Sequence, residues 1–263
     1  MYPPMHEGSK RVCRTMVENL LSGGRFAESM IDHEIESLYF RNLRNSWYHE
    51  VALGYPQDNL EDRLKFAPWK IVQCYYSVFS GICALVRCFH LSGQLSHDST
   101  LNIFGNEFLR NRRRKVFFVA PFNFHLDQHG NFDPAFEKVV GWDYATKYHI
   151  PNILECLKSI HKQSRVTTIP HYLKGLRDWA QYEDSYLFFR LYGKTVKENL
   201  DFSLTRITYG YLVQIEFFLI KLFGWDTLKL QFETFNQELK QNLKIEPSNL
   251  VERFDVYKTH LLR

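Results

Sequence analysis

The chain of 263 residues is 45% hydrophobic, 24% charged and 16% aromatic, a composition that is ordinary for a soluble globular protein. Its net charge of +4 permits a polyanionic partner without requiring one. The five cysteines form no Cys-x-x-Cys pair, which excludes a cysteine-based zinc site, and their odd number without a secretory signal favours a reducing compartment.

Two features predict a cytoplasmic protein without a membrane span. The first residues, Met-Tyr-Pro-Pro-Met-His-Glu, lack the charged-then-apolar pattern of a signal peptide. Charges interrupt the two most apolar stretches, Arg87 in one and Glu216 with Lys221 in the other. Neither stretch is therefore long enough and uncharged enough to cross a bilayer, and no membrane partner is expected.

The first part of the chain predicts two helices before its most apolar stretch. Apolar residues at helical spacing run over residues 10–21 and stop at the Ser-Gly-Gly breaker of 22–24. A second pattern runs over about residues 26–47. The acidic residues of 58–62 then indicate a new helix start, and Pro68 is expected to kink or restart that helix.

Residues 73–93 predict a helix at the centre of a bundle. Apolar side chains recur there at three- and four-residue spacing, and small side chains occupy the remaining faces, so neighbouring helices could approach closely. Gly93 has the position of a residue that ends a helix in the left-handed conformation. The apolar set is Val72, Tyr75, Tyr76, Phe79, Ile82, Cys83, Val86 and Phe89, and the small set is Ser77, Ser80, Gly81 and Ala84.

An inserted region is predicted after this stretch. Ser96 is suited to cap a short helix. The basic run 110–115 follows, and then an apolar, β-prone segment at 116–124 in which Pro121 argues against a central strand. Scattered glycines and prolines favour little regular structure beyond it. We therefore expect an inserted loop or short β segment around residues 110–170.

Helical patterns return in the last third of the chain. No repeat or low-complexity segment divides the sequence, so the expected fold is all-α, in a single domain of residues 1–263. Its core is expected at about 26–225, with a C-terminal helical extension at about 225–263. The predicted helices are 172–191 after Pro170, 194–223 with a break at Gly210, 225–243, and a last one after Pro247.

Four short motifs within residues 70–110 carry a resemblance to a known family. They are Tyr75-Tyr76-x-x-Phe79, Gly93, Ser96-His97 and Ile103-Phe104-Gly105-x-x-Phe108. These motifs resemble the HEPN superfamily, in particular HEPN proteins associated with minimal nucleotidyltransferases. Over about residues 30–225 the likeness lies in the order and pattern of elements. The resemblance implies an HEPN-like helical bundle and a homodimer with its cleft between the subunits.

The segment Arg44-Asn45-Ser46-Trp47-Tyr48-His49 resembles the Arg-polar-x-x-x-His motif of HEPN ribonucleases. Metal-free RNA cleavage uses the 2′-hydroxyl as nucleophile, so it needs a base that titrates near neutral pH, which histidine supplies. It also needs a permanent cation against the charge of the phosphorane, which arginine supplies. The resemblance implies Arg44, Asn45 and His49 as catalytic residues. Alternatively, Arg44 and His49 are solvated residues at a helix end.

A second candidate motif is Arg177-Asp178-x-x-x-Tyr182. In the family the motif helix follows the Tyr-Tyr helix and the Ser-His segment, and Arg177 does so whereas Arg44 does not. Tyr182 stands where the histidine would be, and a tyrosine with a pKa near 10 is a poor base at neutral pH unless strongly perturbed. This alternative catalytic site of Arg177, Asp178 and Tyr182 could therefore be degenerate, and Asp178 could simply pair with a neighbouring cation.

Contacts with nucleic acid are predicted at two further places. His97 could contact a phosphate or nucleotide, or could hydrogen-bond within a helix start. The basic run could bind an RNA or DNA backbone beside stacking phenylalanines, or be a solvated charge run. Its cations are Arg110, Arg112, Arg113, Arg114 and Lys115. No cofactor motif or metal-ligand constellation is found, so neither a cofactor nor a metal is expected.

These features favour an RNA-acting protein, either a metal-independent endoribonuclease or an RNA-binding component. By analogy, the resemblance implies a toxin–antitoxin or phage-defence system, with RNA as ligand and an antitoxin or nucleotidyltransferase as partner. The alternative is a non-catalytic HEPN-like module that binds a protein partner or a nucleotide. A third hypothesis is a DNA-binding accessory subunit that uses the basic run.

Overall fold

The computed structural model describes residues 33–54, 60–88, 96–110, 168–182 and 194–261, and every element within these ranges is a helix. The prediction of an all-α fold is thereby confirmed for the part of the chain that is described. In chain order the elements are α2 (His33–Leu53), α3 (Leu60–Arg87), α4 (His97–Phe104), the π-helical turn η1 (Gly105–Arg110), α7 (Ile169–Tyr182), α9 (Lys194–Phe223), α10 (Trp225–Glu238), the π-helical turn η4 (Leu239–Leu243) and α11 (Ser248–Leu261).

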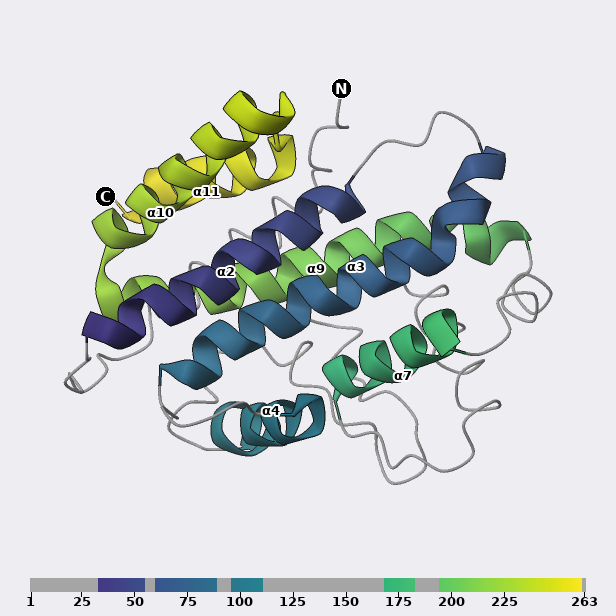
Figure 1. Ribbon diagram of the computed structural model, residues 1–263, viewed down its shortest axis with the longest axis horizontal. Coiled ribbons are helices and arrows are strands. Elements are labelled where there is room, and N and C mark those ends of the chain that lie inside the picture. Colours follow the sequence, from purple (N-terminus) through teal and green to yellow (C-terminus); the bar gives the residue numbers. More distant parts are fainter. Residues whose placement is uncertain (1–32, 55–59, 89–95, 111–167, 183–193, 262–263) are drawn as a thin grey trace.

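Three long helices, α2, α3 and α9, form the middle of the fold (Figure 1). Helices α10 and α11 lie beside α2 and α9, whereas α4 and α7 lie against α3 on the other side. In α9, every residue from Ile207 to Ile220 is buried, on all sides of the helix. A helix that is apolar on all sides belongs in the interior, because each of its faces needs a partner.

Small side chains let α3 approach its neighbours closely. Between α2 and α3, Ser46 Oγ donates to the carbonyl oxygen of Ser77 at 2.7 Å, and Ser77 Oγ donates back to the carbonyl oxygen of Ser46 at 2.9 Å. Facing α9, a Cβ added to Gly81 would meet Ile215 Cδ1 and Leu212 Cδ2 at 3.0 Å each. Of the small residues predicted to admit neighbouring helices, Ser77 thus lies against α2 and Gly81 against α9.

Several predicted helix boundaries agree with the structure, and one predicted interruption does not. Ser96 caps α4, since its Oγ accepts a hydrogen bond from the Ser99 amide at 3.2 Å. Of the two alternatives predicted at Pro68, a kink or a restart, the structure agrees with the kink, because α3 continues through Pro68 and bends in its N-terminal part (Figure 1). The predicted break at Gly210 is wrong, because α9 runs unbroken from Lys194 to Phe223. Packing on all sides offsets the modest cost of a helical glycine.

Some sequence predictions lie outside the described residues. These are the helix of 10–21, Gly93 and the insertion beyond residue 110. Among the described residues, the helical window Phe66–Arg87 has the length and hydropathy of a membrane span, and 72% of it is buried within the fold. Burial of this kind is typical of a core helix.

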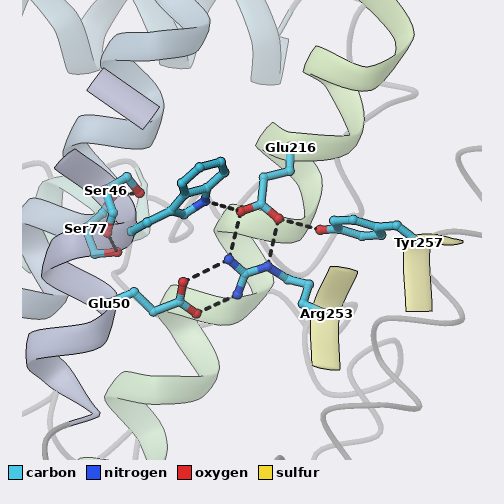
Figure 2. A network of polar contacts seen from close by, with 7 residues as sticks. Ser46, Glu50, Ser77, Glu216, Arg253 and Tyr257 are labelled. Carbon is cyan, nitrogen blue, oxygen red and sulfur yellow. Dashed lines mark hydrogen bonds and ion pairs between the residues drawn. The ribbon is translucent and has the colours of Figure 1, made fainter. Parts of the chain in front are cut away.

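A buried ion network, defined as Glu50, Glu216, Arg253, Trp47 and Tyr257, joins α2, α9 and α11. The Arg253 guanidinium lies between the carboxylates of Glu50 and Glu216 and donates to both, at distances from 2.5 to 2.8 Å (Figure 2). Trp47 Nε1 and Tyr257 Oη each donate to Glu216 at 2.6 Å. The network holds the C-terminal helix against the centre of the bundle.

Candidate functional site

The first motif does not converge on one point. On α2, Arg44 extends toward α10, where its Nη1 lies 3.9 Å from Glu238 Oε1, and Asn45 is exposed. His49 turns toward α3, where its Nδ1 lies 2.7 Å from Oε1 of the buried Gln73. Arg44 and His49 therefore share no partner among the described residues, because five residues along a helix place side chains on different faces.

His97 is the first residue of α4 and lies over the aromatic face of α3. Its ring is stacked on Phe79, with centroids 4.2 Å apart and planes 5° from parallel. Its Nδ1 lies 2.5 Å from the hydroxyl oxygen of Tyr75, which is only 1% exposed. The Ser96 cap fixes the start of α4, so backbone and ring contacts together hold the half-buried imidazole in place.

Arg177 reaches the same tyrosines from α7. Its Cζ lies 4.9 Å from the Tyr75 ring centroid and 5.6 Å from that of Tyr76. Its Nη2 is 2.8 Å from Asp178 Oδ1, and its Nη1 donates to Gln181 Oε1 at 3.3 Å. The Arg177 side chain is nine-tenths buried, and its Nε has no hydrogen-bond partner among the described residues. A cation over a tyrosine face is attracted by the ring quadrupole.

Tyr76 joins these groups into one arrangement. Its ring is stacked against His49, with centroids 5.4 Å apart, and meets the His97 ring edge-on at 6.1 Å. Three segments far apart in the sequence, on α2, α4 and α7, thus meet on one face of α3. We name this set the Tyr75–Tyr76 cluster; its members are His49, Gln73, Tyr75, Tyr76, Phe79, His97 and Arg177.

Burial and neighbouring charge set the protonation of the cluster. Loss of solvent lowers the pKa of His97, and the positive charges of Arg177 and Lys174 lower it further. Burial also raises the pKa of Tyr75 well above that of an exposed phenol. At neutral pH, His97 is therefore a neutral imidazole and Tyr75 a neutral phenol with one proton to donate.

Two carboxylates balance the two cations at the rim of the cluster. Lys174 Nζ lies 3.3 Å from Asp98 Oδ1 and 3.4 Å from Asp178 Oδ2. Asp178 thus bridges Lys174 and Arg177 on α7, as the pairing alternative for this residue anticipated. The rim is partly exposed, so its ion pairs are screened by solvent.

The other predicted site residues contribute less to the described structure. Tyr182 ends α7 and Arg110 ends η1, but their side chains lie outside the described part, as do Arg112, Arg113, Arg114 and Lys115. No group of three His, Cys, Asp or Glu side chains that could hold a metal ion occurs within the described residues. Because the side chains of the basic run lie outside the described part, the predicted nucleic-acid-binding surface stays a prediction.

Sequence reasoning missed Gln73 as the partner of His49, and it treated Tyr75 and Tyr76 as core residues. One signal was available for Gln73, since an amide inside an otherwise apolar helix needs a hydrogen-bond partner when buried. Glu216 gave the same signal within the apolar run of α9. For Arg253 there was none, because an arginine in an amphipathic helix is typical of an exposed face.

Comparisons with models of known protein families, with curated proteins and with solved structures found no match for this chain. The resemblance to HEPN proteins therefore depends on the sequence motifs alone.

Proposed function

We propose that this chain is an RNA-acting, HEPN-like protein that cleaves RNA without a metal ion, at the Tyr75–Tyr76 cluster. The observation that carries the proposal is the convergence of His49, His97 and Arg177 on Tyr76. Cleavage by the 2′-hydroxyl needs a proton acceptor and a cation that faces the phosphorane. The cluster supplies the His49 imidazole for the first role and the Arg177 guanidinium for the second.

The proposed site takes one residue from each of the two predicted motifs. The histidine comes from the first motif and the arginine from the second, whereas Arg44 extends toward Glu238 on α10 and lies outside the cluster. By analogy with the family, we also propose a homodimer that works in a toxin–antitoxin or phage-defence system beside an antitoxin or nucleotidyltransferase. The predicted basic run would extend the path of the RNA.

The test is cleavage of total cellular RNA in EDTA by the purified chain. We expect His49→Ala to reduce the cleavage rate by about 10²–10⁴, the range for losing a proton-transfer group. Arg177→Ala should reduce it by about 10²–10³, the range for losing a charge-stabilising donor. Arg41→Ala is the matched control, because Arg41 is an exposed arginine on α2. Circular dichroism and thermal unfolding establish that each variant is folded.

A non-catalytic module that binds a protein or a nucleotide is the second candidate. The observation that favours it is the engagement of both Nη atoms of Arg177 by Asp178 and Gln181, which leaves fewer donors for a phosphorane. If folded wild-type protein cleaves no RNA at high concentration, the cleavage proposal is wrong. Nucleotide binding that Arg177→Ala abolishes would then support this second function.

A further inference from the structure

The two histidines of the Tyr75–Tyr76 cluster are held by partners of opposite hydrogen-bonding character. A neutral imidazole has one nitrogen that donates and one that accepts, and the partner of Nδ1 decides which is which. Every described hydrogen bond of His49 and of His97 is made through Nδ1. Among the described residues, Nε2 of both rings therefore has no hydrogen-bond partner and can face a ligand.

The partner of His49 accepts a proton. Gln73 Oε1 is an amide oxygen with no hydrogen of its own, so the 2.7 Å contact requires the proton on His49 Nδ1. Gln73 is only 3% exposed, and the His49 ring is stacked on Tyr76, so the pair has little freedom to rearrange. Nε2 of His49 then carries a lone pair and can accept a proton.

The partner of His97, the Tyr75 hydroxyl, donates a proton to the hydrogen bond. The Tyr75 hydroxyl is buried, and His97 Nδ1 is its hydrogen-bond partner in the described structure. If Nδ1 carried the proton, the phenol hydrogen would lack an acceptor there, which is costly for a buried donor. If the phenol donates to Nδ1, both groups are satisfied. The raised pKa of Tyr75 keeps this hydrogen in place, and Nε2 of His97 carries the ring proton.

We infer that the two histidines divide the work of one site: His49 presents a basic Nε2 that removes a proton, and His97 presents a neutral Nε2–H that binds an anionic oxygen. This division depends on the proposed function for its chemical meaning, whereas the positions of the ring protons do not. Tyr75 and Gln73 are then positioning residues, because they act through the histidines.

The division gives a balanced reaction on RNA. His49 Nε2 takes the proton of the 2′-hydroxyl while the 2′-oxygen forms a bond to phosphorus. The bond from phosphorus to the 5′-oxygen breaks, and that oxygen takes a proton from solvent water. The His97 N–H and the Arg177 cation face the charge on the non-bridging oxygens throughout. The products are a 2′,3′-cyclic phosphate and a 5′-hydroxyl.

Nitrogen NMR of the imidazoles in the ¹⁵N-labelled wild-type protein tests the proton positions directly. We expect a protonated Nδ1 in neutral His49 and a protonated Nε2 in neutral His97. The His49 signal is the more informative, because free histidine favours the proton on Nε2. Tyr75→Phe should leave His97 as a mixture of both forms, and Gln73→Met should do the same for His49. A protonated Nδ1 in His97, or a protonated Nε2 in His49, would overturn the inference whether or not RNA is cleaved.

One substitution made at both positions tests the roles. Glutamine keeps an N–H donor but cannot act as a base at neutral pH. His49→Gln should therefore lose about 10²–10⁴ in cleavage rate. His97→Gln should retain at least about tenfold more activity than His97→Leu, which removes the donor. Equal losses in His97→Gln and His97→Leu would refute the donor role. Correct proton positions in a wild-type protein without cleavage would instead refute the proposed function alone.

Discussion

The buried ion network and the Tyr75–Tyr76 cluster both place an arginine among partners from several helices, but they differ in how completely those partners are used. Arg253 gives four hydrogen bonds to two carboxylates, and its side chain has no exposed surface. Arg177 leaves its Nε without a described partner, and Nε2 of His49 and of His97 has no hydrogen-bond partner among the described residues. The first region is saturated and the second is not.

Saturation separates a structural role from a functional one. A buried charge is stable only when it is paired. The charges of the ion network are paired with one another, so they have no free group to offer a ligand. Donors and acceptors left open at a half-buried surface can instead be completed by a substrate. Helix α2 connects the two regions, because its consecutive residues His49 and Glu50 point in different directions, His49 toward Gln73 on α3 and Glu50 toward Arg253 on α11. Changes to each region should therefore have distinct effects.

The largest effect on stability is expected from Arg253→Met. The substitution leaves the carboxylates of Glu50 and Glu216 buried without their cation, and breaking a buried ion pair in this way costs about 3–5 kcal/mol. Urea unfolding at neutral pH measures the change. Removing the charges together, with Glu50→Gln and Glu216→Gln added, should cost less than the single substitution. If Arg253→Met is more stable than the triple variant, the two carboxylates do not depend on Arg253 for their burial, and the network does not hold α11 in place as described.

A smaller effect, with a dependence on pH, is expected at His97. Its pKa is lowered in the folded chain, so the neutral ring contributes stability above the unfolded pKa of about 6.5. That contribution is lost as the pH falls through the folded value. Wild type should thus lose more stability than His97→Gln between about pH 7.5 and pH 5.5. Urea unfolding at both values tests this, and equal losses would mean that His97 isn't held neutral.

Glu50 in the saturated network should behave in the opposite sense. Burial raises its pKa more than Arg253 lowers it. A carboxyl group with a raised pKa favours the fold below its unfolded pKa, and this contribution is lost as the pH rises through the folded value. The two regions are therefore distinguished by the sign of their pH dependence as well as by its range.

The smallest effect is expected from Arg44→Ala. Its contact with Glu238 spans 3.9 Å between side chains that are about a third or more exposed, and surface pairs of this kind contribute about 0–1 kcal/mol. Its effect on RNA cleavage should also be smaller than that of His49→Ala, because Arg44 lies outside the Tyr75–Tyr76 cluster. If Arg44→Ala loses as much cleavage activity as His49→Ala, Arg44 belongs to the catalytic site.

Much of the secondary structure was predictable because helix formation depends on nearby residues. The apolar period gave α3 and α9, Ser96 gave the start of α4, and Pro247 preceded the last helix, since caps and breakers act within one turn. Gly210 misled for the same reason. A glycine lowers helix propensity locally, but the packing of α9 on all sides decides the outcome.

The sequence by itself determined that the described part of this chain is helical, where most described helices begin, and which residue types could handle a proton or a phosphate. Only the tertiary structure decided which of those residues meet. Arg44 and His49 are five residues apart yet face different partners, whereas His49, His97 and Arg177 are far apart and gather around Tyr76. The reason is physical: periodicity fixes the face of a helix on which a residue lies, but the packing of helices fixes what that face meets.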